Sequence, residues 1–204
     1  MRIGLYGGSF DPVHYGHLWV AEEAREKLQL DQVRFIPTAV SPLKARPASA
    51  SDRQRIEMLE LALGGNENFV IDDRELKRGG VSYTVDTLRE MANEFPDASL
   101  FLILGADSLN DLERWKDPSE ICRLATLAVV TRGGTKPPDW SVMARFAEPD
   151  RVSQAREAAI ETALIEISSR ELRKRISEGR SIRYRVPRGV ELLIQNGSLY
   201  RTQD

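Results

Sequence analysis

Short apolar runs alternate with amphipathic segments along most of the chain. Strands are expected at the apolar runs, which cover residues 2–6, 32–36, 68–71, 99–104, 124–131 and 163–167. Two of these runs, SLFLIL and LATLAVVT, are almost continuously apolar, which is typical of strands buried on both faces of a parallel sheet. Helices are expected between or after the strands, at 15–28, 51–63, 84–95, 169–178 and 187–195. Strands that alternate with helices predict an α/β fold built on a doubly wound parallel sheet, with helices on both faces.

The segments are interpreted as one domain that covers residues 1–204. A chain of 204 residues has the size of an ordinary single domain and can bury a substantial core. Residues 133–153 are rich in glycine, proline and charge around a short helix expected at 140–146. We interpret this segment as a peripheral excursion, and residues 167–204 as the C-terminal helical part.

The composition narrows the class of protein. Hydrophobic residues make up 41% and charged residues 29%, as in globular chains, and no apolar run approaches the ~20 residues of a transmembrane helix. The N-terminus lacks the long apolar stretch of a signal peptide, and Cys122 is the single cysteine, so no internal disulfide forms. We therefore expect a cytoplasmic protein that binds no membrane. The sequence leaves open whether it forms a homo-oligomer.

The charge balance shows what kind of phosphate site to seek. Twenty-nine basic and 31 acidic residues give a net charge of −2, so no global field attracts nucleic acid, which is not an expected partner. Any phosphate binding must come from a local site made of glycines, a helix N-terminus and clustered cations.

A glycine-rich loop after the first expected strand has these features. Its sequence is Gly7-Gly8-Ser9-Phe10-Asp11-Pro12-Val13-His14-Tyr15-Gly16-His17. Glycines let a phosphate approach the backbone closely, and the following helix directs its free N–H groups and the positive end of its dipole at the loop. His14 and His17, the two histidines of the chain, are three residues apart and can lie on one face of the helix start. An isolated pair of this kind more often caps and packs, but the glycines and the strand–helix context favour catalysis of phosphate chemistry.

Other signatures of nucleotide or hydrolytic sites are absent from the sequence. It contains no G-x-x-x-x-G-K-[ST], no G-x-G-x-x-G and no G-x-S-x-G motif. Two histidines and one cysteine also make a zinc site improbable, so no metal-ligating side chains are assigned.

The loop resembles the G-[ST]-F-D-P-x-H-x-G-H signature of the HxGH nucleotidyltransferase superfamily. A second stretch, ISSRELR at 167–173, resembles the I-S-S-T-x-[IV]-R element of that superfamily, with Arg170 where threonine is usual. The resemblance implies a Rossmann-like fold and in-line attack on a nucleotide α-phosphate without a covalent enzyme intermediate. It also implies that the catalytic residues are His14, His17 and Arg173, with His17 and Arg173 at the α-phosphate and His14 at the neighbouring phosphates.

Three further stretches are similar to bacterial nicotinate-mononucleotide adenylyltransferases. They are GVSYTVDTL at 80–88, GADSL followed by Leu112 and Trp115 at 105–115, and SIRYRVP at 181–187, where Arg185 replaces leucine. One departure lies after the second expected strand, where the family often has P-P-H-K. Here Leu43 stands in place of the histidine, while Lys44 keeps the cation.

The family resemblance implies a reaction and a set of binding residues. Nicotinate mononucleotide and ATP would give deamido-NAD and pyrophosphate, with Mg²⁺ held mainly by substrate phosphates and water. ATP binding is implied for Gly7, Gly8, Ser9, Phe10, Gly105, Asp107, Ile167, Ser168 and Ser169. Nicotinate mononucleotide binding is implied for Lys44, Ser82, Tyr83, Thr84 and Trp115, with Tyr83 and Trp115 as the wall for the pyridine ring. Thr84 and backbone N–H groups near Trp115 and Lys116, both expected at helix starts, would bind the nicotinate carboxylate and favour the acid over the amide.

Two alternatives stay open at this point. Another adenylyltransferase of the same fold, for phosphopantetheine or nicotinamide mononucleotide, should lack Ser82-Tyr83-Thr84 together with Trp115. A non-catalytic nucleotide-binding regulator need not keep His14, His17 and Arg173. An assay of pyrophosphate release with different acceptors separates these possibilities.

Overall fold

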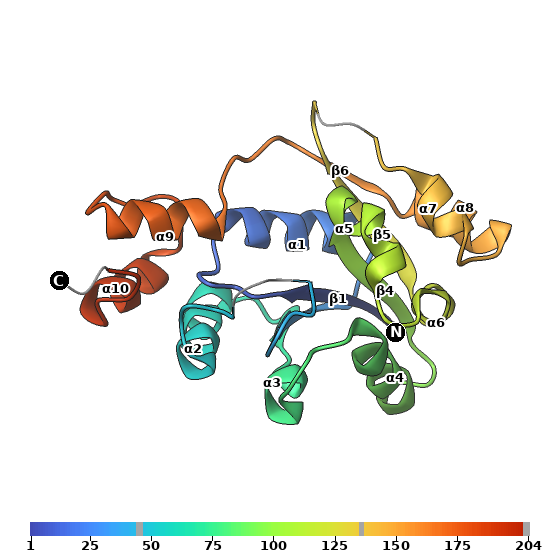
Figure 1. Cartoon of the computed structure of the whole chain (residues 1–204), viewed down its shortest axis with the longest axis horizontal. Coiled ribbons are helices and arrows are strands. Elements are labelled where there is room, and N and C mark those ends of the chain that lie inside the picture. Colours follow the sequence, from blue (N-terminus) through green and yellow to red (C-terminus); the bar gives the residue numbers. More distant parts are fainter. Residues whose placement is uncertain (44–46, 135–136, 202–204) are drawn as a thin grey trace.

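A computed structural model describes residues 1–43, 47–134 and 137–201, which form a single α/β domain. Its strands are β1 (Arg2–Gly8), β2 (Gln32–Pro37), β3 (Phe69–Ile71), β4 (Ser99–Gly105), β5 (Thr126–Arg132) and β6 (Ile160–Thr162). They pair in parallel in the order β3-β2-β1-β4-β5-β6 (Figure 1). This is the Rossmann-like, doubly wound sheet that the alternation of strands and helices predicted, and the fold class is confirmed.

The helices of the described chain follow the strands in sequence. They are α1 (Tyr15–Lys27), α2 (Asp52–Leu63), α3 (Arg74–Arg78), α4 (Thr84–Glu94), α5 (Ala106–Asn110), the 3-10 helix η1 (Leu112–Arg114), α6 (Pro118–Leu124), α7 (Trp140–Ala144), α8 (Pro149–Glu157), α9 (Ser169–Ser177) and α10 (Arg188–Asn196). The sequence predicted five of these and a short helix near α7. It missed α3, α5, η1 and α6, which have seven residues or fewer, and α8.

Successive residues of a strand point to opposite faces of a sheet, so the pleat divides the core in two. Ile3 and Leu5 of β1 belong to a cluster with α4, α5, α6, α7 and α8. On the other face, α1, α2, α9 and α10 pack against residues such as Phe35 and Ile103. Figure 1 shows α1 and α4 on opposite sides of β1. Helices therefore cover both faces, as expected.

The last strand was placed wrongly by the sequence. A strand was expected at 163–167, but β6 covers Ile160–Thr162 and pairs with β5, Ile160 opposite Val130. The side chains of Ile160 and Thr162 point to the same face of the sheet and are buried, whereas Glu161 between them is exposed. This pattern is common in a strand at the edge of a sheet. The apolar residues that follow β6 do not belong to a strand. Leu164 is 54% exposed, and Ile165 lines a cavity.

Residues 133–153 contain α7 and the first turn of α8. Helix α8 buries Val152 and Ala155 against the core and lies on the connection between β5 and β6. A glycine- and proline-rich stretch thus leads into an ordinary crossover helix. No helix in the described ranges has the length and apolar character that a membrane span requires.

The strand order turns at β1, whose neighbours β2 and β4 lead in opposite directions across the sheet. Tyr6 is aligned with Ile103, so β1 and β4 end side by side at Gly8 and Gly105. In open α/β sheets this switch point, outside the carboxyl ends of the strands, is where ligands bind.

Candidate active site

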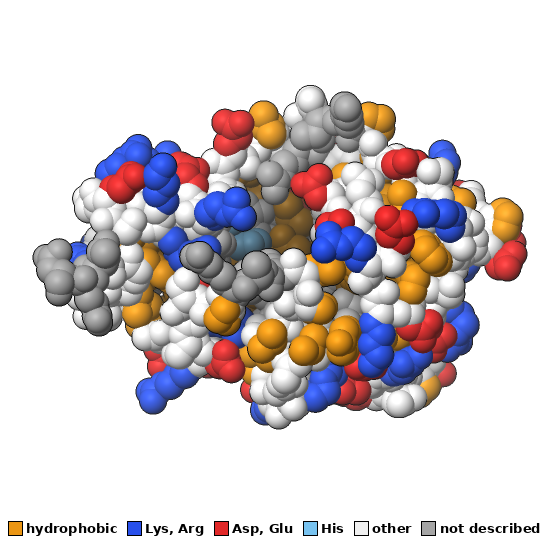
Figure 2. Space-filling model, in the orientation of Figure 1, with side chains coloured by type: hydrophobic (Ala, Val, Ile, Leu, Met, Phe, Trp, Pro, Cys, Tyr) orange, Lys and Arg blue, Asp and Glu red, His pale blue; other side chains and the backbone are white. Residues whose placement is uncertain are grey.

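A cavity of about 950 Å³ opens at the carboxyl end of β1. The loop between β1 and α1 and the N-terminus of α9 form much of its wall. Figure 2 shows this hollow in the middle of the face, with the surface of a histidine inside it. Residues that the sequence assigned separately meet here, namely Gly8, Ser9, His14, His17, Ile167, Ser168, Ser169 and Arg173.

The two histidines form one unit at the start of α1. His14 is the N-cap, and its ring stacks on that of His17 with 3.7 Å between centroids and 20° between planes. The backbone N–H of His14 donates to Nδ1 of His17 at 3.2 Å. Since Nδ1 accepts this hydrogen bond, the neutral imidazole of His17 carries its proton on Nε2. His17 is thereby fixed in orientation and tautomer as a hydrogen-bond donor.

Small and aromatic neighbours hold this unit in place. A Cβ at Gly16 would lie 3.1 Å from Nδ1 of His14, so the glycine between the histidines lets the His14 ring pack against the backbone. Phe10 is 1% exposed and its ring makes an edge contact with His17, 5.1 Å between centroids. The side chain of Phe10, expected at the ATP site, therefore supports His17 from the core and does not line the cavity.

Asp11 connects the loop to distant parts of the chain. Its carboxylate is buried and accepts hydrogen bonds from the backbone N–H groups of Ser49 and Ala50, at 2.7 and 3.0 Å. The hydroxyl of Tyr200 donates to the same carboxylate at 2.8 Å. Burial, together with the charge of Asp11, raises the pKa of Tyr200 above its ordinary range, so this hydroxyl remains a proton donor. Asp11 thus connects the loop between β1 and α1, called the phosphate loop below, to the segment before α2 and to the C-terminal region.

Arginines hold the backbone of the loop from two sides. Nη1 of Arg173 donates to the carbonyl of Asp11 at 2.6 Å, and its side chain remains 31% exposed toward the cavity. Arg55 of α2 is fully buried, and its Nη1 donates to the carbonyls of Ser9 and Thr38, both at 2.9 Å. These bonds join the ends of β1 and β2. They also fix the backbone of the loop at Ser9 and Asp11.

The start of α9 is the second wall of the cavity. Ser168 is the N-cap of the helix and accepts a hydrogen bond from the backbone N–H of Glu171 at 3.2 Å. The hydroxyl of Ser169 donates to the carbonyl of Pro12 at 2.9 Å, which fixes α9 against the phosphate loop. Two helix N-termini, those of α1 and α9, therefore converge on one cavity, an arrangement suited to an anion.

The wall of the cavity carries both polar and apolar side chains. The two histidines, Ser168, Ser169 and Arg173 are polar, whereas Trp19, Val20, Ala163, Ile165 and Ile167 are apolar. Trp19 is 46% exposed. Such a lining fits a ligand that combines phosphates with a flat base.

Of the residues expected to bind the pyridine nucleotide, the four that the structure describes do not line this cavity. Ser82, Tyr83 and Thr84 lie at the start of α4, on the other face of the sheet. Thr84 is the first residue of the helix, as expected. Ser82 is buried, and its hydroxyl accepts from the backbone N–H of Ala39 at 3.0 Å while its own N–H donates to the carbonyl of Val40. Ser82 therefore fixes the loop after β2 against α4.

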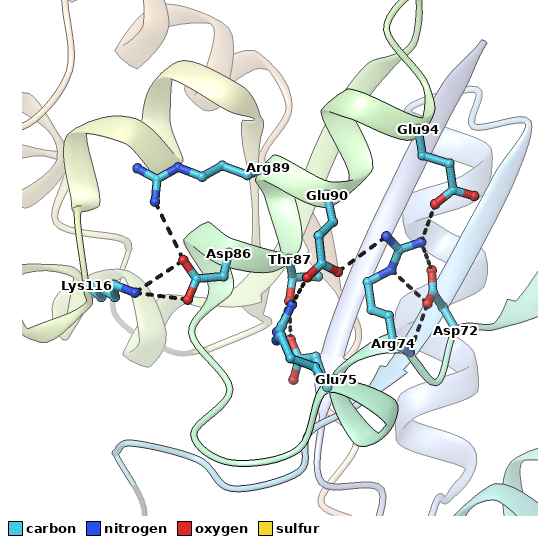
Figure 3. A network of polar contacts seen from close by, with 10 residues as sticks. Asp72, Arg74, Glu75, Asp86, Thr87, Arg89, Glu90, Glu94 and Lys116 are labelled. Carbon is cyan, nitrogen blue, oxygen red and sulfur yellow. Dashed lines mark hydrogen bonds and ion pairs between the residues drawn. The ribbon is translucent and has the colours of Figure 1, made fainter.

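An ion-pair network surrounds α4 (Figure 3). Nζ of Lys116 is 3.0 and 3.2 Å from the carboxylate oxygens of Asp86 and 4.5 Å from the ring centroid of Tyr83. One face of the expected pyridine platform thus carries a lysine ammonium. Deeper in the network, burial raises the pKa of Glu75, although hydrogen bonds from Thr87 and Ser82 act in the opposite direction.

The expectation that Trp115 begins a helix is wrong. Trp115 follows η1, and its backbone N–H donates to the carbonyl of Leu112 at 3.0 Å. That N–H is not available to a carboxylate. Helix α6 begins at Pro118, so Lys116 is not at a helix start either. The indole of Trp115 packs against the core cluster that contains α4.

The remaining residues that the sequence assigned to ligand binding are not found in the cavity wall or lie outside the described chain. Gly7, Gly105 and Asp107 do not line the cavity, although Gly105 ends β4 beside the phosphate loop. A Cβ at Gly7 or Gly105 would meet no atom within 4 Å, so both face open space. Lys44 lies outside the described residues.

Sequence reasoning did not identify Asp11, Arg55, Tyr200 and Trp19 as site residues. Arg55 and Tyr200 gave no signal, because each acts through contacts with residues far away in the sequence. Trp19 did give a sequence signal. A large aromatic residue on the exposed side of a helix beside a phosphate loop is a candidate for binding a base.

In the described ranges, no group of three or more His, Cys, Asp or Glu side chains is placed to hold a metal ion. The polar side chains of the cavity wall include imidazoles, hydroxyls and guanidinium groups. Such a donor set fits phosphate oxygens.

Comparisons with known proteins agree with this geometry. A profile of the cytidylyltransferase-like family matches residues 5–176. The "Probable nicotinate-nucleotide adenylyltransferase" of Rhodopirellula baltica is 50% identical over 201 residues, covering 98% of this chain and 94% of that protein. The protein of the same name from Thermus thermophilus is 43% identical over 201 residues and is covered along 100% of its length.

A solved structure supports the fold. The Plasmodium falciparum nicotinic acid mononucleotide adenylyltransferase complexed with NaAD has a TM-score of 0.76 at 19% identity, covering 98% of this chain and 97% of that one. With the stacked histidines at the switch point and relatives of up to 50% identity over nearly the full length, the chain belongs to the cytidylyltransferase-like family and, within it, to the nicotinate-nucleotide adenylyltransferases.

Proposed function

We propose that this protein joins nicotinate mononucleotide and ATP to give deamido-NAD and pyrophosphate, a step of NAD biosynthesis. The observation that carries the proposal is the histidine unit at the cavity, in which the His14 backbone fixes His17 as a donor. The likeness in sequence to named nicotinate-nucleotide adenylyltransferases supports the choice of acceptor.

The reaction forms one bond and breaks one bond at the α-phosphorus of ATP. A phosphate oxygen of nicotinate mononucleotide attacks, the bond to the β-phosphate oxygen breaks, and pyrophosphate leaves with its electron pair. This kind of transfer depends mainly on positioning and on electrostatic stabilisation of the phosphate oxygens. His17 and Arg173 would hold the α-phosphate, His14 the neighbouring phosphates, and the N-termini of α1 and α9 would complement the negative charge.

Mg²⁺ fits this proposal as an ion that arrives with the triphosphate. The cationic and hydroxyl groups of the cavity would bind phosphate oxygens of the complex, and the ion would offset part of the negative charge that the phosphates share. Trp19 and the other apolar side chains of the wall would receive the adenine base.

Tyr83, Thr84 and Trp115 are proposed as the pyridine site. Thr84 begins α4, an 11-residue helix, so its N–H and hydroxyl can donate to the nicotinate carboxylate. Since the backbone N–H of Trp115 is bonded to Leu112, we assign the carboxylate to the N-terminus of α4. An amide NH₂ facing a donor costs about 1–3 kcal/mol, so the acid should be preferred at least roughly tenfold.

The test measures pyrophosphate release with ATP and each of three acceptors, namely nicotinate mononucleotide, nicotinamide mononucleotide and phosphopantetheine. The proposal expects the highest kcat/KM with nicotinate mononucleotide. Equal values for acid and amide would contradict the donor site at α4, and turnover of phosphopantetheine alone would contradict the assignment. Binding of ATP without turnover of any acceptor would indicate a regulator.

A further inference from the structure

Arg55 is a buried charge that helix α2 itself does not require. It is the fourth residue of the helix and is fully buried, whereas the other buried side chains of α2 are Met58, Leu59 and Leu63. A buried guanidinium costs free energy that an apolar side chain does not, and the first turn of a helix is unfavourable for a cation. Its carboxylate partner, Asp52, lies 2.6 Å from Nη2 but is 60% exposed. Core packing and this ion pair therefore do not explain the arginine.

One nitrogen of Arg55 bridges two loops at the carboxyl edge of the sheet. Nη1 donates to the carbonyl of Ser9 in the phosphate loop and to the carbonyl of Thr38 after β2, both at 2.9 Å. The two strands are neighbours there, because Gly8 is aligned with Pro37 and the N–H of Thr38 donates to the carbonyl of Gly8. Arg55 thus fixes the distance between the two loops at the point where they leave the sheet.

The loop after β2 leads directly to the start of α4. The backbone N–H of Ala39 donates to Oγ of Ser82 at 3.0 Å, and the N–H of Ser82 donates to the carbonyl of Val40 at 2.8 Å. Ser82 lies two residues before Thr84, the first residue of α4. A continuous series of hydrogen bonds therefore runs from the phosphate loop through Arg55 and the loop after β2 to the residues proposed for the pyridine site.

Under the proposed function, the acceptor joins the same two regions. Its pyridine ring would lie at α4 and its phosphate at the histidines, so the molecule would pass over the end of β2. In-line attack requires a defined separation of the two reacting phosphates, and a misplacement of about 1 Å can lower the rate by about 10². The protein sets this separation through the link between the phosphate loop and the loop after β2.

We propose that Arg55 is a positioning residue, which holds the ATP side and the acceptor side of the active site at the separation that the reaction needs. The proposal rests on the proposed function, because it requires a substrate at each end of the link. Arg55 contacts neither substrate, since it is fully buried and does not line the cavity. It acts through the backbone of Ser9 and Thr38. Without it, each side still binds its own substrate, but the two phosphates are no longer aligned for attack.

Ligands that fill one side of the site or both sides test this role. AMP fills the ATP side, nicotinate mononucleotide fills the acceptor side, and deamido-NAD joins the two in one molecule. Arg55→Met keeps a long unbranched side chain but removes the donors. Calorimetry should show that this variant binds deamido-NAD about tenfold more weakly, while AMP and nicotinate mononucleotide each bind within about twofold of the native affinity. The kcat with both substrates saturating should fall at least about tenfold.

Two further variants separate positioning from loss of stability. Arg55→Lys keeps a cationic donor for the two carbonyls and should recover part of the kcat and of the affinity for deamido-NAD, and it replaces Arg55→Met in every comparison if that variant does not fold. Leu63→Ala removes a buried side chain at the last residue of α2, so it should lower the melting temperature. Its kcat and its three affinities, measured below the melting temperature, should stay within about twofold of the native values. An equal loss in Leu63→Ala, or a parallel loss for all three ligands in the Arg55 variants, would overturn the proposal.

The same measurements distinguish this proposal from the proposed function. If the native protein uses nicotinamide mononucleotide in preference to the acid, the proposed function fails. The role of Arg55 is then tested in the same way by comparing NAD with AMP and nicotinamide mononucleotide. If a folded Arg55→Met forms deamido-NAD with the native kcat, the proposed function stands and Arg55 is not a positioning residue.

Discussion

The β1–α1 loop and the N-terminus of α4 both present polar groups near the carboxyl edge of the sheet, but they differ in what those groups already bind. In the loop, hydrogen bonds from Arg55 and Arg173 occupy backbone carbonyls, and the histidines line an open cavity. At α4, the groups bind one another, because Lys116 pairs with Asp86 and covers a face of Tyr83.

Under the proposed function, this difference separates a phosphate site that is preformed from a pyridine site that must rearrange. Donors that are already fixed would stabilise the phosphate charge at little reorganisation. A pyridine ring that stacks on the covered face of Tyr83 must first displace the Lys116 ammonium. Loss of a histidine donor at the cavity should therefore act on kcat, and loss of an aromatic ring beside α4 should act on the KM of the acceptor.

The largest expected effect is that of His17→Ala. His17 would donate to the α-phosphate most strongly as charge develops, so kcat should fall by about 10²–10³ while the affinity for ATP changes little. Steady-state kinetics with both substrates saturating, and calorimetry with ATP, measure the two quantities. A native kcat in a folded variant would remove His17 from the mechanism.

The sheet was predictable because its signal is local. The runs 99–104 and 124–131 are apolar along almost their whole length, as a strand buried on both faces requires, and β4 and β5 lie at or within two residues of them. The run at 163–167 is just as apolar, but β6 formed at Ile160–Thr162 because pairing with β5 and burial decide an edge strand. Helix α8 was missed because a glycine- and proline-rich stretch precedes it and much of its surface is charged.

The phosphate side of the site was likewise predictable where contacts are local. His14, Gly16 and His17 lie within four residues, and their spacing alone places them together at a helix start. Arg55 and Tyr200 act on Ser9 and Asp11 from 46 and 189 residues away, distances over which no sequence pattern gives a signal. The Trp115 N–H was assigned wrongly because a single 3-10 turn before it uses that donor.

The next largest effect is expected for Tyr200→Phe, which tests how firmly the phosphate side is held. The variant leaves Asp11 without the hydroxyl donor at 2.8 Å. A hydrogen bond to a charged group is worth about 1.5–3 kcal/mol, so the melting temperature should fall by roughly 3–10 °C. The kcat should stay within about twofold, because Ser49 and Ala50 still bind Asp11. An unchanged melting temperature would show that Tyr200 does not hold the loop.

On the acceptor side, Trp115→Ala should raise the KM for nicotinate mononucleotide at least about fivefold. Stacking of a base on an aromatic ring is worth about 1–3 kcal/mol and acts on substrate and transition state alike. Trp115→Phe, which keeps an aromatic ring, should recover much of the loss. Because Trp115 also packs against the core, thermal unfolding of both variants is measured in parallel. Equal increases in the KM for ATP and for the acceptor would identify a purely structural tryptophan.

The smallest effect concerns Glu75, the buried carboxyl group under α4. Burial raises its pKa, so the folded protein favours the protonated form more than the unfolded chain does. The stability that this proton provides is present in full below the unfolded pKa of about 4.3 and is lost as the pH rises through the raised folded pKa. Glu75→Gln keeps an oxygen acceptor for the Thr87 hydroxyl, which now donates to Glu75 at 2.7 Å, and carries no charge at any pH.

The difference in melting temperature, Glu75→Gln minus native, should therefore be smallest below about pH 4, increase through the titration of Glu75 and level off above it. Glu67→Gln, the same substitution at an exposed carboxylate, corrects for the loss of one negative charge. A difference that decreases as the pH rises would mean that Arg78, whose Nη2 donates to Thr87 at 2.9 Å, stabilises the ionised form instead. In that case an ion pair between Arg78 and Glu75 would hold the start of α4. Charged groups would then fix both α4 and the phosphate loop before any substrate binds.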